Sequence, residues 1–102
     1  MIHVIATIEI HEGRREAFLT EFRQLVPLVL AEAGCLEYGA TIDVGAGLAV
    51  QQPLRENVVT VVEKWASVEH LQAHLAASHM QDYRIKVKDM LVGLSLIVLE
   101  PA

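Results

Sequence analysis

The chain has 102 residues, of which 53% are hydrophobic and 21% are charged, and its formal net charge is −5. This composition excludes a disordered chain, and the length leaves room for one hydrophobic core. The acidic balance argues against nucleic acid as a partner, because phosphate backbones are bound by basic surfaces. A single cysteine excludes an internal disulfide and any metal cluster built from several cysteines.

From the sequence we expect neither a targeting signal nor a membrane span. The N-terminus carries no basic region ahead of its apolar run, as a signal peptide would. The longest nearly uncharged apolar stretch, residues 90–99, is too short to cross a bilayer as a helix. We therefore expect one domain over residues 1–102, located in the cytoplasm and without membrane insertion.

The first third of the chain predicts a strand followed by a helix. Residues 2–10 alternate between two faces, which is typical of a half-buried strand. From about Arg14 the apolar residues recur at steps of three and four, which predicts an amphipathic helix. Its apolar stripe consists of Phe18, Phe22, Leu25, Val29 and Ala33. We expect a bend at Pro27, which lacks a backbone donor, and an end at Gly34.

The middle of the chain is less regular. Residues 35–44 predict a second strand, and the glycines and proline of residues 45–57 predict a turn with space for an edge segment at 48–52. Residues 58–65 are rich in β-branched side chains and predict a third strand. One face of that strand carries Val59, Val61, Glu63 and Trp65.

The last third predicts helical segments and a closing strand. Ser67 is a suitable N-cap, and a helix is expected to follow it. The apolar stripe of this helix is Val68, Leu71 and Leu75. Residues 78–79 should break or restart the helix, and a last helical stretch should reach about Asp89. Residues 91–99 then predict the final strand.

The order β-α-β-β-α-β indicates a ferredoxin-like α+β fold, with an antiparallel sheet that carries its helices on one face. The other face would hold Ile5, Val58 and Val62. Apolar side chains on an uncovered sheet need a partner surface, and a homodimer that pairs two sheets face to face would supply it.

Glu63 and Trp65 are two apart on a predicted strand, so both point to the same face. If the indole packs toward the helices, the carboxylate does too, and a buried carboxylate needs a partner. Such a group concentrates at functional sites, where burial raises its pKa. The alternative is a structural anchor that accepts hydrogen bonds from the N-terminus of the second helix.

Three histidines follow the third strand. His70 and His74 are four apart on one helical flank, and His79 lies just beyond. A zinc site needs a third and a fourth ligand, and no carboxylate follows or precedes the histidines at a spacing typical of metal ligands. We therefore expect no metal. We expect His70 to face solvent and His74 to flank the apolar stripe beside a cavity. His74 or His79 could accept a proton near neutral pH, or His79 could simply be a hydrogen-bonded core histidine.

Other familiar chemistry has no support in the sequence. No glycine-rich loop of the phosphate-binding kind follows a strand, and no Ser-His-Asp motif occurs. Cys35 follows the end of a helix, away from any helix N-terminus that would stabilise a thiolate. We therefore expect neither a nucleotide nor a flavin.

Several short motifs resemble those of the antibiotic biosynthesis monooxygenase family, and most of all its small quinol-monooxygenase branch. The markers are Val4-Ile5-Ala6, Gly13, Leu25-Val26-Pro27, Gly34-Cys35, Tyr38, residues 63–67, His70-Leu71, His74-Leu75, His79-Met80 and Tyr83. The Glu-x-Trp and His-x4-His parts are the more specific of these. The resemblance covers nearly the whole chain.

This resemblance implies a dimeric α+β barrel with a pocket between sheet and helices in each subunit. It also implies oxidation of a quinol, polycyclic phenol or similar aromatic by dioxygen, without flavin, haem or metal. On this basis His74 is the expected base, Trp65 a wall that packs against the substrate ring, and Glu63 the residue that orients the base. Further expected substrate-binding residues are His79, Tyr38, Tyr83, Ala6 and Leu71.

The chain also departs from other branches of the family. The haem-degrading branch carries an Asn near Ala6 and a tryptophan near His74, so haem degradation is disfavoured. The polyketide-oxidising branch carries an Asn where this chain has Val61. Two alternatives remain: a dimeric protein that binds a small molecule without turnover, or an isomerase of a small phosphorylated carbonyl compound. The isomerase would need cations in the pocket, and Arg84 or Lys86 are the candidates.

Overall fold

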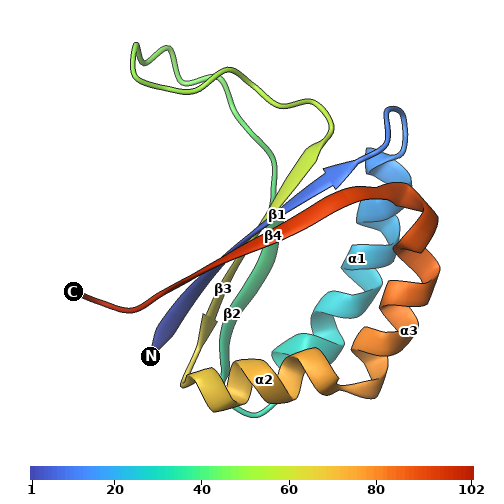
Figure 1. Ribbon diagram of the computed structural model, residues 1–102, viewed down its shortest axis with the longest axis vertical. Helices are drawn as coiled ribbons and strands as arrows, with labels where there is room; N and C mark the ends of the chain where they lie inside the picture. Colours follow the sequence, from blue (N-terminus) through green and yellow to red (C-terminus); the bar gives the residue numbers. More distant parts are fainter.

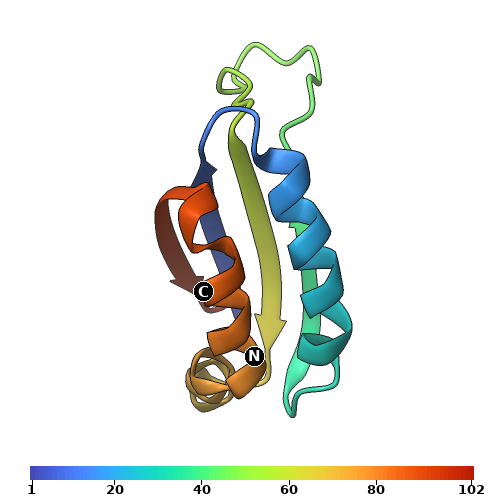
Figure 2. The ribbon, with the colours of Figure 1, turned by 90° about the vertical axis from the view of Figure 1, so that its right-hand side faces the viewer.

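The computed structural model of the chain describes all 102 residues, and it contains four strands and three α-helices. In chain order the elements are β1 (Ile2–Ile10), α1 (Arg15–Leu30), β2 (Cys35–Thr41), β3 (Val58–Trp65), α2 (Val68–Ala76), α3 (Ser78–Val87), the 3₁₀ turn η1 (Lys88–Met90) and β4 (Leu91–Leu99). The strands form one antiparallel sheet in the order β2-β3-β1-β4. All helices lie on the same side of this sheet (Figures 1 and 2). The predicted ferredoxin-like α+β fold is therefore confirmed.

The two central strands, β1 and β3, set the layout of the core. Every second residue of β1 from Ile2 onward is buried, as its alternation predicts. The predicted face of β3 is buried in the same way, at Val59, Val61, Glu63 and Trp65. In the antiparallel register Val4 pairs with Glu63 and Ile2 with Trp65. The sheet thus holds a carboxylate and an indole next to each other beneath the helices.

Helix α1 supplies most of the opposite layer. It buries Phe18, Leu19, Phe22, Leu25 and Val29. The helix runs through Pro27 but stops at Leu30, so Ala33 lies beyond it and is exposed, contrary to the prediction. Gly34 turns the chain with a φ of 78°, in the left-handed region that favours glycine. A Cβ at Gly34 would also collide with the ring of His70. Both the backbone angle and this close contact therefore require glycine at this position.

Two expectations for α2 are wrong. His70 is half-buried rather than solvent-facing, because its ring packs against the turn between α1 and β2. Of the predicted stripe only Leu71 is buried, whereas Val68 and Leu75 are 44% and 38% exposed. The reason is the direction of the helix, which crosses the end of the sheet instead of running along it (Figure 1). It therefore buries only Leu71 and His74.

The break between the last helices occurs where the sequence predicts it. Ala77 has extended backbone angles, φ −64° and ψ 145°, and α3 begins at the next residue. α3 and η1 end at Met90, and β4 then occupies the predicted range. This restart changes the helix direction between His74 and His79, so the two histidines reach the same place from different helices.

The connection between β2 and β3 differs from the prediction. β2 ends at Thr41 rather than Val44, and no edge strand forms at residues 48–52. Instead residues 42–57, called the arm below, form an irregular excursion that stands away from the sheet (Figure 1).

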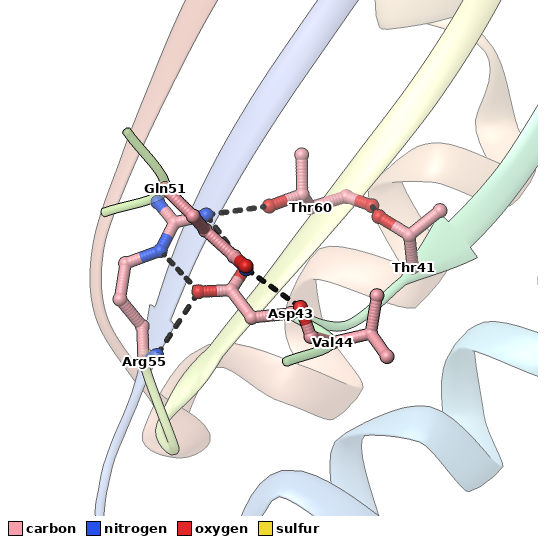
Figure 3. Close-up of polar contacts among 6 residues, drawn as sticks. All are labelled: Thr41, Asp43, Val44, Gln51, Arg55 and Thr60. Atoms are coloured by element: carbon pink, nitrogen blue, oxygen red, sulfur yellow. Dashed lines mark hydrogen bonds and ion pairs between the residues drawn. The ribbon is translucent and has the colours of Figure 1, made fainter. Parts of the chain in front are cut away.

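The arm is held by its own polar groups. The Arg55 side chain donates two hydrogen bonds of 2.8 Å to the carboxylate of Asp43 (Figure 3). Gln51 donates to the Val44 carbonyl at 2.6 Å and accepts from the Ala46 amide at 3.0 Å. Because these groups find partners within the arm, they do not need the edge of the sheet.

The sheet face opposite the helices is partly apolar. Its centre holds Ile5 and Val62, which are half-buried, and on β4 it continues to Ile97 and Leu99, which are 56% and 46% exposed. Val58 lies on this face, as predicted, but it is already buried within the chain and needs no partner to cover it. None of the helices is both long and apolar enough to pass through a membrane.

Candidate active site

A cavity of about 320 Å³ lies between the helices and the sheet. It is lined by sixteen residues from all four strands, α1, α2, α3 and η1, and twelve of them are hydrophobic. The four others are Glu63, His74, Arg84 and Lys88. An apolar hollow with few polar groups is the usual form of a small-molecule site.

Glu63 is bound by the tryptophan two residues along the same strand. The Trp65 Nε1–H donates to Glu63 Oε1 at 2.9 Å, and both side chains are buried. Burial raises the pKa of the Glu63 carboxyl, the Trp65 hydrogen bond opposes this rise, and the negative charge of Glu32 adds to it. The expected hydrogen bonds from the N-terminus of α2 to Glu63 do not form, since the Ser67 hydroxyl caps that helix instead.

His74 is held by a carboxylate that the sequence did not reveal. Its Nδ1–H donates to Glu32 Oε2 at 2.8 Å, and the Nε2–H of His79 donates to the same oxygen at 2.9 Å. Glu32 lies in the turn after α1, where its amide bonds the Val29 carbonyl and its own carbonyl accepts from the Cys35 amide. This turn carries Glu32 to the junction of α2 and α3.

The tautomer of His74 follows from this partner. An ionised carboxylate can only accept, so the proton of the neutral imidazole sits on Nδ1 and Nε2 is left as an acceptor. Every side-chain nitrogen or oxygen atom that has no accessible surface also has a hydrogen-bond partner. His74 Nε2 has no such partner, so it is not one of these enclosed atoms. Nε2 must therefore open on free space, and the space that His74 lines is the cavity.

The charge state of His74 suits an acceptor. Burial lowers the pKa of His74 below its ordinary 6.5, and the hydrogen bond and charge of Glu32 only partly oppose this. Its ring is also fixed, with the Trp65 ring centroid 4.6 Å away and the Tyr38 ring edge-on at 5.5 Å. The imidazole is thus neutral near pH 7 and locked in one orientation.

The structure brings only part of the predicted set to the cavity. Tyr38, Tyr83 and Ala6 line it together with Glu63 and His74. Burial raises the pKa of both tyrosines, so both stay protonated and can donate hydrogen bonds.

Three predicted residues lie elsewhere. Trp65 and Leu71 are buried but do not line the cavity, and the indole stands behind Glu63 and His74. His79 lines a separate small pocket of about 110 Å³. The sequence shows which face a residue occupies, but the depth at which it lies depends on the layer packed above it.

The cations that would serve a phosphorylated substrate are also only partly in place. Arg84 and Lys88 line the cavity, whereas Lys86 lines the small pocket beside His79. Arg84 donates to the Leu75 carbonyl at 2.7 Å, so part of its hydrogen-bonding capacity is already used. This arrangement offers weak support for an isomerase of phosphorylated compounds.

Most of the chain matches a known protein family. The family description "Antibiotic biosynthesis monooxygenase" matches residues 1–85. The chain belongs to this family. The "Probable quinol monooxygenase YgiN" of Escherichia coli K12 is 37% identical over 103 residues, which cover 99% of this chain and 98% of that protein. The resemblance predicted from the sequence is thereby confirmed.

Solved structures show the same architecture. PA3566 from Pseudomonas aeruginosa matches with a TM-score of 0.81 and 26% identity, over 99% of this chain and 93% of that one. Rv0793 from Mycobacterium tuberculosis matches with a TM-score of 0.79 and 22% identity, over 99% and 94%. The second likeness bears on the fold alone.

Proposed function

We propose that the cavity oxidises a quinol or a compact polycyclic phenol with dioxygen, without flavin, haem or metal. The observation that carries this proposal is the acceptor nitrogen of His74, which opens on an apolar cavity while Glu32 holds the other side of the ring. The name of the Escherichia coli relative, which is called a probable quinol monooxygenase, supports the class of substrate.

The proposed reaction starts with proton transfer. His74 Nε2 accepts the proton of a quinol hydroxyl, and Glu32 stabilises the imidazolium that forms. The resulting quinolate is electron-rich enough to reduce dioxygen directly. One oxygen atom enters the ring and the other leaves as water, so the quinol supplies all the electrons and a hydroxyquinone is the product. The apolar wall keeps bulk water from the anion.

Other polar groups have assigned roles in this scheme. Glu32 is a positioning residue, since it contacts His74 and does not line the cavity. Tyr38 and Tyr83 are placed to donate hydrogen bonds to substrate oxygens. Glu63, held by Trp65, is a second acceptor for a substrate hydroxyl. The volume of about 320 Å³ is at the small end for ligand sites, which suits a compact aromatic rather than haem.

Turnover of a reduced naphthoquinone by chelator-treated protein tests the proposal. We expect oxygen uptake above the protein-free rate in air, a product heavier by one oxygen than the parent quinone, and no reaction under argon. No protein-dependent uptake across a panel of quinols and phenols would overturn it. If Trp65 fluorescence instead reports saturable binding and the ligand is recovered unchanged, the non-catalytic binding protein is the correct alternative.

We infer, in addition, that a second copy of the chain covers the open sheet face, as a homodimer or an assembly of dimers. The support is the apolar row of Ile5, Val62 and Ile97, which no helix covers. Light scattering should give the dimer mass for the native chain and the monomer mass for Ile97→Lys. The matched control is Val50→Lys in the arm, where the native side chain is 88% exposed. A native monomer would contradict this inference.

We also keep the cytoplasm as the proposed location. The support is Cys35, the single cysteine of the chain, which is free, as cysteines are in a reducing compartment.

A further inference from the structure

Three potential metal ligands from three different segments converge at the outer side of His74. Glu32 comes from the turn after α1, His74 from α2 and His79 from α3. One ligand atom of each lies within 4.8 Å of the others. A carboxylate oxygen stands 2.8 Å from His74 Nδ1 and 2.9 Å from His79 Nε2. The sequence concealed this triad because its carboxylate lies 42 residues before the nearer histidine.

The three ligand atoms are of the kind that divalent transition metals of intermediate softness prefer. Two imidazole nitrogens and one carboxylate are common ligands of Zn²⁺ and Fe²⁺, whereas Mg²⁺ and Ca²⁺ prefer oxygen alone. Zinc–ligand distances are about 2.0–2.2 Å, so tetrahedral ligand atoms lie roughly 3.3 Å apart. The observed spacings of 2.8 and 2.9 Å would have to widen by a few tenths of an ångström. The nitrogens of His74 and His79, which lie within 4.8 Å of each other, would also have to settle at about 3.3 Å.

The triad also has an approach from solvent. The side chains of His79 and Glu32 are 25% and 14% exposed, whereas that of His74 is 2% exposed. The small pocket that His79 lines carries two further carboxylates, Glu21 and Asp82, against one cation, Lys86, so the balance of charge favours the approach of a cation. An ion can therefore arrive from the outer side without passing through the apolar cavity.

We propose that Glu32, His74 and His79 form a binding site for one divalent transition-metal ion, with Zn²⁺ as the probe and water as the remaining ligand. The bound ion replaces the two ring protons that now point at Glu32. It ties the turn after α1 to α2 and α3 at a point where no disulfide can do so, since the chain has one cysteine.

The site has a consequence for the cavity, and this consequence rests on the proposed function. When His74 Nδ1 is a metal ligand, the neutral ring must carry its proton on Nε2. The atom facing the cavity then donates instead of accepting, and His74 can no longer take a proton from a quinol. Saturating Zn²⁺ should lower the rate of quinol oxidation at least tenfold, and chelator should restore it. An unchanged rate at saturation would overturn this coupling.

Calorimetric titration of the chelator-treated full chain with Zn²⁺ tests the site itself. We expect one ion per chain, with an affinity at least tenfold weaker in Glu32→Gln and in His79→Gln. His11→Gln is the matched control, because the exposed His11 uses only its backbone in hydrogen bonds. It should bind as the native chain does. Circular dichroism of each variant checks that it is folded, and the partly exposed His79 keeps the test valid if Glu32→Gln unfolds.

The outcomes separate the two proposals. Absence of stoichiometric binding, or binding that neither Glu32→Gln nor His79→Gln weakens, overturns the metal site whatever the oxidation assay gives. Binding that depends on His79, in a protein that oxidises no quinol, supports the metal site and overturns the proposed function. Cobalt supplies an independent readout, because Co²⁺ in a tetrahedral site absorbs visible light, and His79→Gln should remove that absorption.

Discussion

Two carboxylates with side-chain donors occupy opposite environments in this chain. Glu63 is buried at the cavity and accepts one hydrogen bond from a neutral indole, and its pKa is raised because burial outweighs that bond. Asp43 lies partly exposed in the arm, where hydrogen bonds from Arg55 lower its pKa to about 2. Ionisation of the carboxyl group is thus unfavourable in the buried region and favourable in the arm, where the charge lies beside Arg55 and near water.

The difference indicates where substitutions should matter. The region around the cavity holds its polar groups in two hydrogen-bonded groups, Glu63 with Trp65 and Glu32 with two histidines. The arm holds its ion pair in water, where screening weakens it. Changes at the cavity should affect activity and stability, and changes in the arm should affect only the arm.

The largest expected effect is on catalysis. His74→Gln removes the base, and kcat/KM for quinol oxidation should fall by about 10²–10⁴, the usual contribution of a positioned general base. Steady-state oxygen uptake measures it. Arg55→Ala in the arm is the comparison variant and should leave kcat/KM as it is. Unchanged oxidation by His74→Gln would show that another group takes the proton.

The next largest effect is on stability. Trp65→Phe removes the donor to Glu63 and leaves a buried carboxylate unpaired, which should lower the free energy of unfolding by about 1–3 kcal/mol. Urea unfolding followed by circular dichroism measures the loss. In a Glu63→Gln background the neutral amide needs that donor less, so the same substitution should cost less. An equal cost in both backgrounds would mean that ring packing, not the hydrogen bond, dominates.

The two carboxyls should titrate in opposite directions from their ordinary values. Carbon-detected NMR of the folded chain should place Asp43 at a pKa of about 2 and Glu63 above 4.5. The signs follow by linkage: Asp43 favours folding above pH 3.8 and loses this effect as the pH falls toward 2. Glu63 disfavours folding increasingly as the pH rises above 4.5. If both pKa values were raised, or both lowered, from their ordinary values, the two carboxyl groups would not differ in the way proposed.

The smallest effect is expected in the arm. Asp43→Asn removes the charge that Arg55 contacts, and the midpoint of urea unfolding should fall only slightly, because water screens this partly exposed ion pair. Hydrogen exchange of the Arg55 amide, which donates to Asp43 at 3.0 Å, should accelerate. A clear loss of global stability would place the arm within the cooperative core.

Local patterns were sufficient for most of the fold. The alternation of β1 and β3 and the β-branched run of β3 predicted their ranges and their buried faces, since a strand repeats every two residues. The resemblance of residues 63–67 and the following histidines predicted the family. Predictions failed where a neighbouring layer decides the outcome, as with Val68 and Leu75 on a helix that crosses the end of the sheet.

The site was predictable only in part, for the same reason. Spacing placed Glu63 and Trp65 on one face, but not the indole behind the carboxylate. Glu32 had no local signal, because a carboxylate in the turn after a helix is usually solvated. It acquires its role only when the restart at Ala77 brings His74 and His79 to the same oxygen.

The central claim is that dioxygen inserts one atom into a quinol held beside His74. Its most direct test is the stoichiometry of oxygen uptake by metal-stripped protein with a reduced naphthoquinone, with catalase added at the end of the reaction. The account predicts one dioxygen consumed per quinol, a hydroxyquinone as product, and no oxygen returned by catalase. Release of half the consumed oxygen by catalase, with the plain quinone as product, would mean simple oxidation to hydrogen peroxide and would contradict the account.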